Sequence, residues 1–116
     1  YVEDDEFNRL LLAQVFADRP HWQLLLAGTV AEGIDMAVQS RPDLILADMN
    51  LPDGHGIELI ARVREALGAY PVRMAALSAD ALPQQVEAAT RAGYERYWTK
   101  PVDLSELLGW LDDLLC

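Results

Sequence analysis

Several acidic residues and one lysine occupy positions in this chain where they can act together on a charged group. Asp48 directly follows the apolar run 44–47, which is typical of a buried strand in a parallel sheet. The acidic cluster at 3–5 and the lysine at 100 follow other apolar segments. Open α/β sheets carry their reactive groups at the carboxyl ends of the strands. Three carboxylates and a lysine at that edge predict a magnesium-dependent acceptor of a phosphoryl group.

The elements that must position these residues follow from the alternation of apolar runs with segments of helical period. Helices are predicted over 6–18, 30–40, 57–67, 82–92 and 103–115. Strands are predicted as a remnant at 1–2 and as the runs 22–27, 44–48, 72–77 and 94–98. Five strands alternating with five helices predict an α/β fold in which helices cover both faces of a parallel sheet.

Local signals predict where some helices begin and end. Thr29 and Glu32 have the spacing of a capping box, and Asp103 is a predicted N-cap for the last helix. Gly93 is expected to end the helix before it. Trp110 lies at the boundary of the leucine stripe of the last helix, where it either contacts a partner or covers the edge of the sheet.

The composition limits the class of protein. A chain of 116 residues that is 52% hydrophobic is expected to form one domain over 1–116. A net charge of −10 argues against contact with nucleic acid. Cys116 is the sole cysteine, so no intrachain disulfide is possible and a cytoplasmic setting is expected. No signal peptide or membrane-spanning run is found, so no membrane contact is expected. Because Tyr1 opens the chain inside a strand, we expect a longer protein truncated within its first strand.

The motifs, taken together and in order, resemble those of response-regulator receiver domains of two-component phosphorelay signalling. The resemblance rests on Val2-Glu3-Asp4, Leu44-Ile45-Leu46-Ala47-Asp48, Leu51-Pro52-Asp53-Gly54-His55-Gly56, Leu77-Ser78-Ala79 and Tyr97-Trp98-Thr99-Lys100-Pro101. It covers the whole chain. It implies a flavodoxin-like, doubly wound, five-stranded parallel sheet of order 2-1-3-4-5.

The resemblance also implies a phosphoacceptor and a metal site. Asp48 would accept the phosphoryl group from a histidine of a sensor kinase or a phosphotransfer protein. Glu3, Asp4 and Asp48 would hold Mg²⁺ together with the backbone carbonyl of Asn50. Lys100 would pair with Asp48 and then with a phosphoryl oxygen. The Lys100–Pro101 peptide bond is expected to be cis, as in relatives.

The remaining implied roles concern the conformational switch. The Ser78 hydroxyl would bind another phosphoryl oxygen, and Ser78 with Tyr97 would change the conformation of the region 78–101. Residues 78–83 resemble the receivers of hybrid sensor kinases, although Asp80 stands where those often have Asn. Any output domain would lie outside this chain. The module would catalyse only its own phosphotransfer and dephosphorylation and would not be an enzyme in the usual sense.

Other interpretations stay open from the residues alone. The acidic cluster also suits the first helix, to which Asp5 and Glu6 can supply an N-cap and dipole partners. Ser78 alone is typical of a turn, and a single lysine is usually solvated. A receiver fold can also serve as a phosphorylation-independent interaction module. An aspartyl-phosphate hydrolase would need a second Asp where Asn50 stands, and a flavin-binding protein would need a phosphate loop after the first strand.

Overall fold

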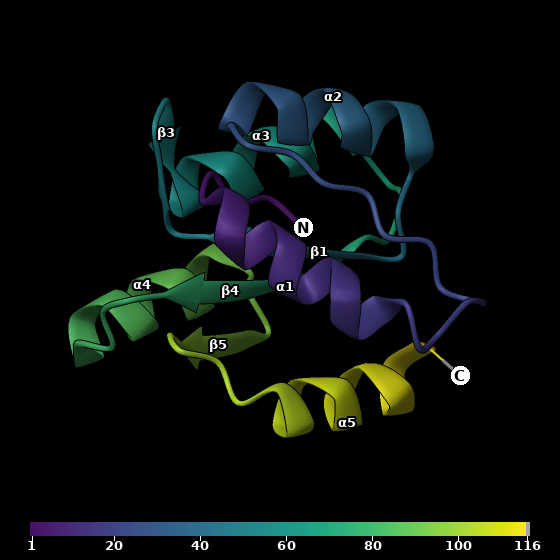
Figure 1. Cartoon of the computed structure of the whole chain (residues 1–116). Coiled ribbons are helices and arrows are strands. Elements are labelled where there is room, and N and C mark those ends of the chain that lie inside the picture. The colour runs from purple at the N-terminus through teal and green to yellow at the C-terminus, as the bar shows by residue number, and fades with distance from the viewer. Residues whose placement is uncertain (116) are drawn as a thin grey trace.

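The computed structural model describes residues 1–115 as helices packed around one parallel sheet (Figure 1). The helices are α1 (Glu6–Phe16), α2 (Val30–Ser40), α3 (Gly56–Leu67), α4 (Pro83–Ala92) and α5 (Leu104–Leu115). The strands are β1 (Leu44–Asp48), β2 (Asn50–Leu51), β3 (Gly54–His55), β4 (Arg73–Ser78) and β5 (Arg96–Thr99). Cys116, on which the disulfide prediction rests, lies outside the described residues.

The sheet has the predicted order. Strands β1, β4 and β5 pair in parallel, in that order. Val2 extends the sheet through parallel bridges to Ala47 on one side and to Ala27 on the other. The spatial order is therefore residue 27, residue 2, β1, β4 and β5, which corresponds to 2-1-3-4-5. Because all five segments run in one direction, their carboxyl ends meet at one edge of the sheet.

Each face of the sheet is covered by its own set of helices. Ile45 and Ala47 of β1 point into a core that they share with buried residues of α2, α3 and α4. Leu46, between them, points into a second core formed with Leu12 of α1 and Leu107 of α5. Successive side chains of a strand alternate between faces. Because both faces of β1 are covered, β1 is apolar at every position except its last, where the Asp48 carboxylate belongs to neither core.

The strand predicted for 22–27 is reduced to one bridge at Ala27. Ala27 donates to the Tyr1 carbonyl at 3.0 Å and accepts from the Glu3 amide at 2.8 Å. Residues 22–25 border a cavity of about 440 Å³ that they share with 44–46. The strand prediction was therefore too long, because an apolar run forms a ladder only where a neighbouring strand lies alongside it.

A short hairpin, in which β2 pairs with β3, lies in the region predicted as a loop at 50–56. The turn 52–53 joins the two strands. Gly56 follows the hairpin and packs against Met49 so closely that a Cβ atom on Gly56 would lie 2.1 Å from the Met49 side chain. A side chain at residue 56 would displace the end of the flexible Met49 side chain and would place its Cβ atom 3.1 Å from the Met49 Cα, so this close approach favours glycine.

The predicted N-caps of α2 and α5 and the predicted end of α4 are confirmed, whereas α1 ends at Phe16, before the predicted residue 18. Asp5, Thr29 and Asp103 each accept a hydrogen bond from the backbone amide three residues later, at 3.1, 3.0 and 3.1 Å. Gly93 ends α4 with a φ of 118°, in the left-handed region that favours glycine. Glu32 departs from the capping box, because its carboxylate accepts from the amide of Gly28.

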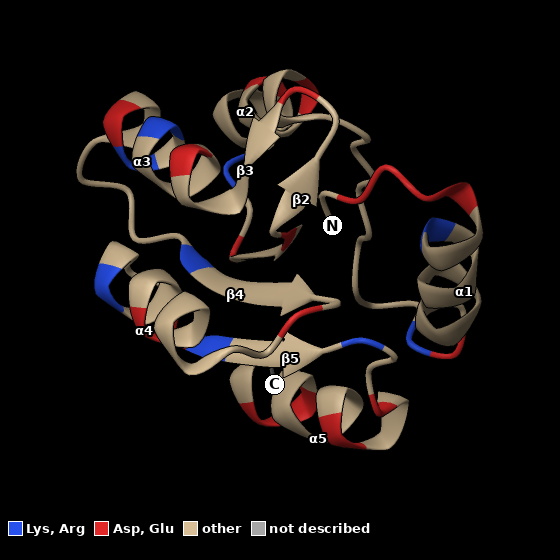
Figure 2. Ribbon diagram, turned by 90° about the vertical axis from the view of Figure 1, so that its left-hand side faces the viewer, with Lys and Arg blue, Asp and Glu red and all other residues tan. Residues whose placement is uncertain are grey.

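The charged residues are distributed unevenly in Figure 2, where acidic positions gather as the chain enters α1. Basic residues are spread over several elements, and α3 carries two of them, Arg62 and Arg64. Among the residues that the structure describes, no helix has both the length and the apolar character needed to cross a membrane.

Candidate functional site

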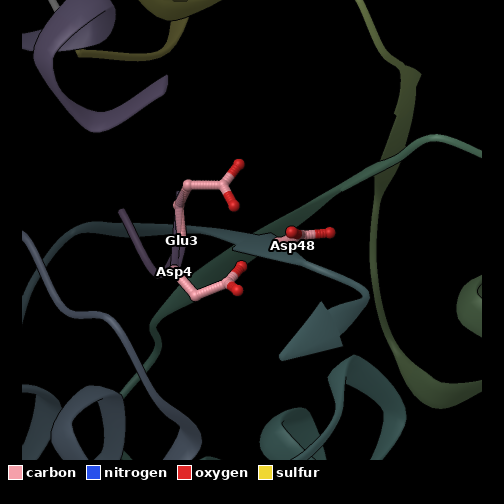
Figure 3. A group of neighbouring side chains, drawn as sticks. All are labelled: Glu3, Asp4 and Asp48. Atoms are coloured by element: carbon pink, nitrogen blue, oxygen red, sulfur yellow. The ribbon is translucent and has the colours of Figure 1, made fainter. Parts of the chain in front are cut away.

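Three carboxylates meet at the carboxyl edge of the sheet (Figure 3). Glu3 and Asp4 follow the bridged residue Val2, and Asp48 is the last residue of β1. Each of the three offers a carboxylate oxygen within 4.8 Å of the other two. Glu3 is fully buried and Asp48 is 5% exposed, whereas Asp4 is open to solvent. Two of the three carboxylates are therefore buried, and the third is exposed to solvent.

Lys100 joins two of these carboxylates. Its ammonium nitrogen lies 2.5 Å from Glu3 Oε1 and 3.1 Å from Asp48 Oδ2. Its backbone amide donates to the carbonyl of Ser78 at 2.8 Å, which ties the end of β5 to the end of β4. The Lys100–Pro101 peptide bond is cis, as predicted. One positive charge thus lies directly between the two buried acids.

The buried acids differ in their proton affinity. The pKa of the Asp48 carboxyl is raised to about 6, chiefly by burial and then by the Glu3 carboxylate. Burial acts on Glu3 in the same direction, but hydrogen bonds to Lys100 and Asp48 hold its pKa below the ordinary value. Burial alone would lower the pKa of Lys100, but the two carboxylates raise it above its usual range. Glu3 and Lys100 therefore carry their charges more firmly than Asp48 does.

Glu3 has further partners that the sequence did not predict. The Tyr1 hydroxyl donates to Glu3 Oε1 at 3.1 Å, and the Asn8 side-chain amide donates to the same oxygen at 3.3 Å. The Asp5 backbone amide donates to Glu3 Oε2 at 3.3 Å. Tyr1 and Glu3 are two residues apart, so strand alternation places them on one side. The contact with Asn8 depends on the angle at which α1 leaves the strand, which no local pattern gives.

Asn50 lies next to the acidic cluster. The Asn50 backbone amide donates to Asp48 Oδ1 at 3.2 Å, and Asn50 pairs with His55 across the hairpin. This bond orients the Asp48 carboxylate and brings the backbone of residue 50 to the rim of the cluster. The set of oxygen donors suits Mg²⁺, which prefers carboxylate, carbonyl and water oxygens. The residues present therefore fit that ion.

Ser78 ends β4, the strand next to β1, and Tyr97 lies on β5, the strand beyond β4. Ser78 is buried, and its hydroxyl accepts from the Asp80 amide at 3.1 Å. The half-buried Tyr97 donates its hydroxyl to the Asp80 carbonyl at 2.6 Å. A cavity of about 250 Å³ lies between these residues and Asn50. Both candidate switch residues are therefore hydrogen-bonded to the backbone of Asp80. They lie beside a cavity large enough for a side chain to enter.

Asp53 is a second residue that sequence reasoning missed. It lies in the turn of the hairpin, and its carboxylate accepts from the amides of Val30 and Ala31 at 2.7 and 3.1 Å. These hydrogen bonds hold the pKa of Asp53 below its ordinary value. An aspartate in a turn is usually expected to bond within its own loop. Here it bonds to a helix more than twenty residues earlier in the chain.

Comparison with known proteins gives the family. The family model of the response regulator receiver domain matches residues 1–112. The "Uncharacterized 14.6 kDa protein in sodA1 3'region" of Leptolyngbya boryana is 35% identical over 107 residues, which cover 92% of this chain and 81% of that protein. The sensory/regulatory protein RpfC of Xanthomonas campestris is 29% identical over 115 residues. That match covers 97% of this chain but only 16% of RpfC.

A solved structure shares the fold. It is the receiver domain of a sensor histidine kinase from Pseudomonas aeruginosa PAO1, described with a magnesium ion coordinated in its active site cleft. The similarity has a TM-score of 0.84 at 26% sequence identity and covers 97% of this chain and 92% of that one. With the family model matched over nearly the whole length and the sheet order in agreement, this chain belongs to the response regulator receiver domain family, the phosphorylation-controlled switches of two-component signalling.

Proposed function

We propose that Asp48 is the phosphoacceptor and that its donor is the phosphohistidine of a sensor kinase or a phosphotransfer protein. The observation that carries this proposal is the position of Asp48, which is buried among two further acids and 3.1 Å from the Lys100 ammonium. In the transfer, an Asp48 carboxylate oxygen forms a bond to phosphorus while the phosphorus–nitrogen bond of the donor breaks. The electron pair returns to the imidazole, and the product is an acyl phosphate.

Glu3, Asp4, Asp48 and the backbone carbonyl of Asn50 would hold Mg²⁺. The bound ion would neutralise charge on the transferring group, where catalysis is mainly positioning and electrostatics. Lys100 then exchanges its contact with Asp48 for one with a phosphoryl oxygen. Its fixed place between Glu3 and Asp48 supports this role, because the ammonium needs to move little to follow the charge.

Ser78 and Tyr97 would convert phosphorylation into a change of shape. A phosphoryl group on Asp48 adds acceptor oxygens that can draw the Ser78 hydroxyl away from the Asp80 amide. Tyr97 would then turn inward and lose its bond to the Asp80 carbonyl. The adjoining cavity of about 250 Å³ supports this movement. The region 78–101 would carry the signal.

The module acts as a switch, and its catalysis is limited to its own phosphotransfer and dephosphorylation. We place it in the cytoplasm, acting on protein partners and not on nucleic acid or membrane. The chain matches only a small part of RpfC, and a solved relative belongs to a sensor histidine kinase. An output or kinase domain elsewhere in a longer protein is therefore part of the proposal. The alternative is an interaction module that works without phosphorylation.

One experiment separates these two functions. Protein is incubated with a small phosphodonor and Mg²⁺, and its intact mass is measured. One phosphoryl group is expected on the wild type and on the control Asp35→Asn, which changes an exposed aspartate of α2. None is expected on Asp48→Asn or in the presence of a chelator. Equal labelling of Asp48→Asn contradicts the assignment of the phosphoacceptor, and an unlabelled wild type favours the interaction module.

A further inference from the structure

The turn of the β2–β3 hairpin is bonded to the first turn of α2. Both carboxylate oxygens of Asp53 are used, one by the amide of Val30 at 2.7 Å and one by the amide of Ala31 at 3.1 Å. The first amides of a helix have no partner within the helix, so they need an outside acceptor. The positive end of the α2 dipole adds to the attraction for a carboxylate. Asp53 is thus a second cap on α2, supplied from a distant segment.

The helix already has a cap of its own. Thr29 accepts from the amide of Glu32 at 3.0 Å and is the N-cap residue of α2. Thr29 belongs to the helix it caps, whereas Asp53 belongs to the hairpin. Loss of either acceptor weakens the start of α2, but only loss of Asp53 releases the hairpin. The two residues therefore form a natural pair of variant and control.

The hairpin connects this anchor to the acidic cluster. Beside its turn, a Cβ atom on Gly54 would lie 3.2 Å from the Val30 side chain, so the hairpin packs directly on α2. At its open end, Asn50 donates its amide to Asp48 Oδ1 at 3.2 Å. Leu51 between them is buried in the core beneath. The hairpin is short and is held at both ends, so a displacement at the turn moves residue 50.

We propose that Asp53 is a positioning residue for the metal site: by anchoring the hairpin to α2, it fixes the backbone carbonyl of Asn50 where that carbonyl can bind Mg²⁺. The inference rests on the proposed function, which takes that carbonyl as a ligand. Asp53 touches neither the ion nor the phosphoryl group. Its contribution is rigidity, because a ligand that is already in place loses little freedom when the ion binds.

The test compares Asp53→Ala, Asp53→Asn and Thr29→Ala with the wild type. Mg²⁺ is titrated while backbone amide shifts are followed by NMR, and amide hydrogen exchange of residues 50–55 is measured in metal-free protein. We expect Asp53→Ala to raise the Mg²⁺ dissociation constant roughly tenfold, the smaller of the effects typical for loss of a residue that orients a metal ligand. Exchange of the hairpin amides should accelerate in the same variant.

The control variants make the result specific. Thr29→Ala should lower the melting temperature without changing either Mg²⁺ affinity or hairpin exchange. Asp53→Asn keeps one acceptor oxygen and should give an intermediate result, which also covers the case in which Asp53→Ala fails to fold. If the Asp53 variants match Thr29→Ala in Mg²⁺ affinity, the inference is overturned while the metal site stands. If the wild type itself binds no Mg²⁺, the proposed metal site and this inference both fail.

Discussion

Lys100 determines the charge balance of the site, because it is the only lysine in the chain and lies between two buried acids. It has two opposing effects. As a cation it occupies oxygens that a divalent ion would also use, and as a donor it can follow a transferring phosphoryl group. If both effects operate, removing Lys100 should change Mg²⁺ affinity and phosphorylation rate in opposite directions. A purely structural ion pair would give no such opposition.

The substitution Lys100→Gln should tighten Mg²⁺ binding and slow phosphorylation. Mg²⁺ affinity rises because the competing ammonium is gone. Phosphorylation by a small phosphodonor falls by roughly a hundredfold, the lower range for loss of one preorganised donor to the transition state. Both are measured on the same preparation, by NMR titration and by intact mass against time. The control is Arg73→Gln, which removes an exposed cation paired with Glu95. Parallel loss of affinity and rate would argue for structural damage.

The substitution Asp48→Asn should raise the melting temperature of metal-free protein at neutral pH. Burial and the Glu3 carboxylate raise the pKa of Asp48, so its ionised form is unfavourable in the fold. Asparagine keeps the shape and removes the charge. Thermal unfolding in the presence of a chelator measures the difference, with Asp35→Asn as a control for an exposed charge. A lower melting temperature for Asp48→Asn would show that the carboxylate stabilises the cluster.

At the scale of elements, the ends of β4 and β5 are connected through Asp80. Its amide bonds to Ser78 and its carbonyl to Tyr97, so the segment that follows β4 is bonded to the two residues expected to move. The last strand pairs with β4 alone among the described strands, at one edge of the sheet. An edge strand and an exposed segment have few other contacts to restrain them, and such regions open most readily.

A phosphoryl mimic should therefore alter amide exchange in 79–93 and 97–101 more than elsewhere. Hydrogen exchange with mass detection is measured with and without the mimic in the presence of Mg²⁺. Asp48→Asn serves as the control and should show no response. Changes confined to 50–56 would contradict the switch and would instead mark a purely local effect of binding.

The hairpin anchor gives a prediction for pH. Its hydrogen bonds from Val30 and Ala31 lower the pKa of Asp53 in the folded protein. A carboxyl of this kind stabilises the fold above its unfolded pKa, and the stabilisation is lost as pH falls through the folded pKa. The melting temperature of wild type should exceed that of Asp53→Asn at pH 7, and the gap should begin to narrow below about pH 4 and close as pH falls through the lower folded pKa. A gap that persists in acid would show that the anchor does not depend on ionised Asp53.

Hydrophobic periodicity in the sequence predicted the helices and strands that bury one face. It did not predict contacts between segments that are distant in the sequence. The leucine spacing of α5 and the apolar run of β1 can each be recognised from the sequence of that segment alone. The anchor between Asp53 and α2 depends on how the hairpin turn approaches the start of α2 in space, which no local pattern gives. The strand predicted at 22–27 has the right composition, but its ladder depends on a neighbour that pairs only near Ala27.

At the scale of the whole molecule, α1 carries three of the large exposed apolar side chains among the described residues. Phe7, Leu10 and Leu11 of α1 are 70%, 57% and 38% exposed, and their spacing places them on one side of the helix. Trp110, for which the sequence leaves open a partner contact or a cover for the edge of the sheet, is half-buried and packs edge-on against Trp98 with ring centroids 6.4 Å apart. The helix begins directly after Asp4 and Asp5, so its first turn, which carries Phe7, follows the acidic cluster in the chain.

A protein that delivers a phosphoryl group to Asp48 must cover this rim, and we expect α1 to be part of its contact surface. Phe7→Ser and Leu10→Ser should lower the rate of transfer from a phosphohistidine protein roughly tenfold, which corresponds to loss of about 1.4 kcal/mol of binding. Transfer from a small phosphodonor needs no docking and should be unchanged. Val38→Ser is the control, because Val38 is 46% exposed near the far end of α2. Equal loss with both donors would place the defect in the site itself, and full activity with the protein donor would exclude α1 from the interface.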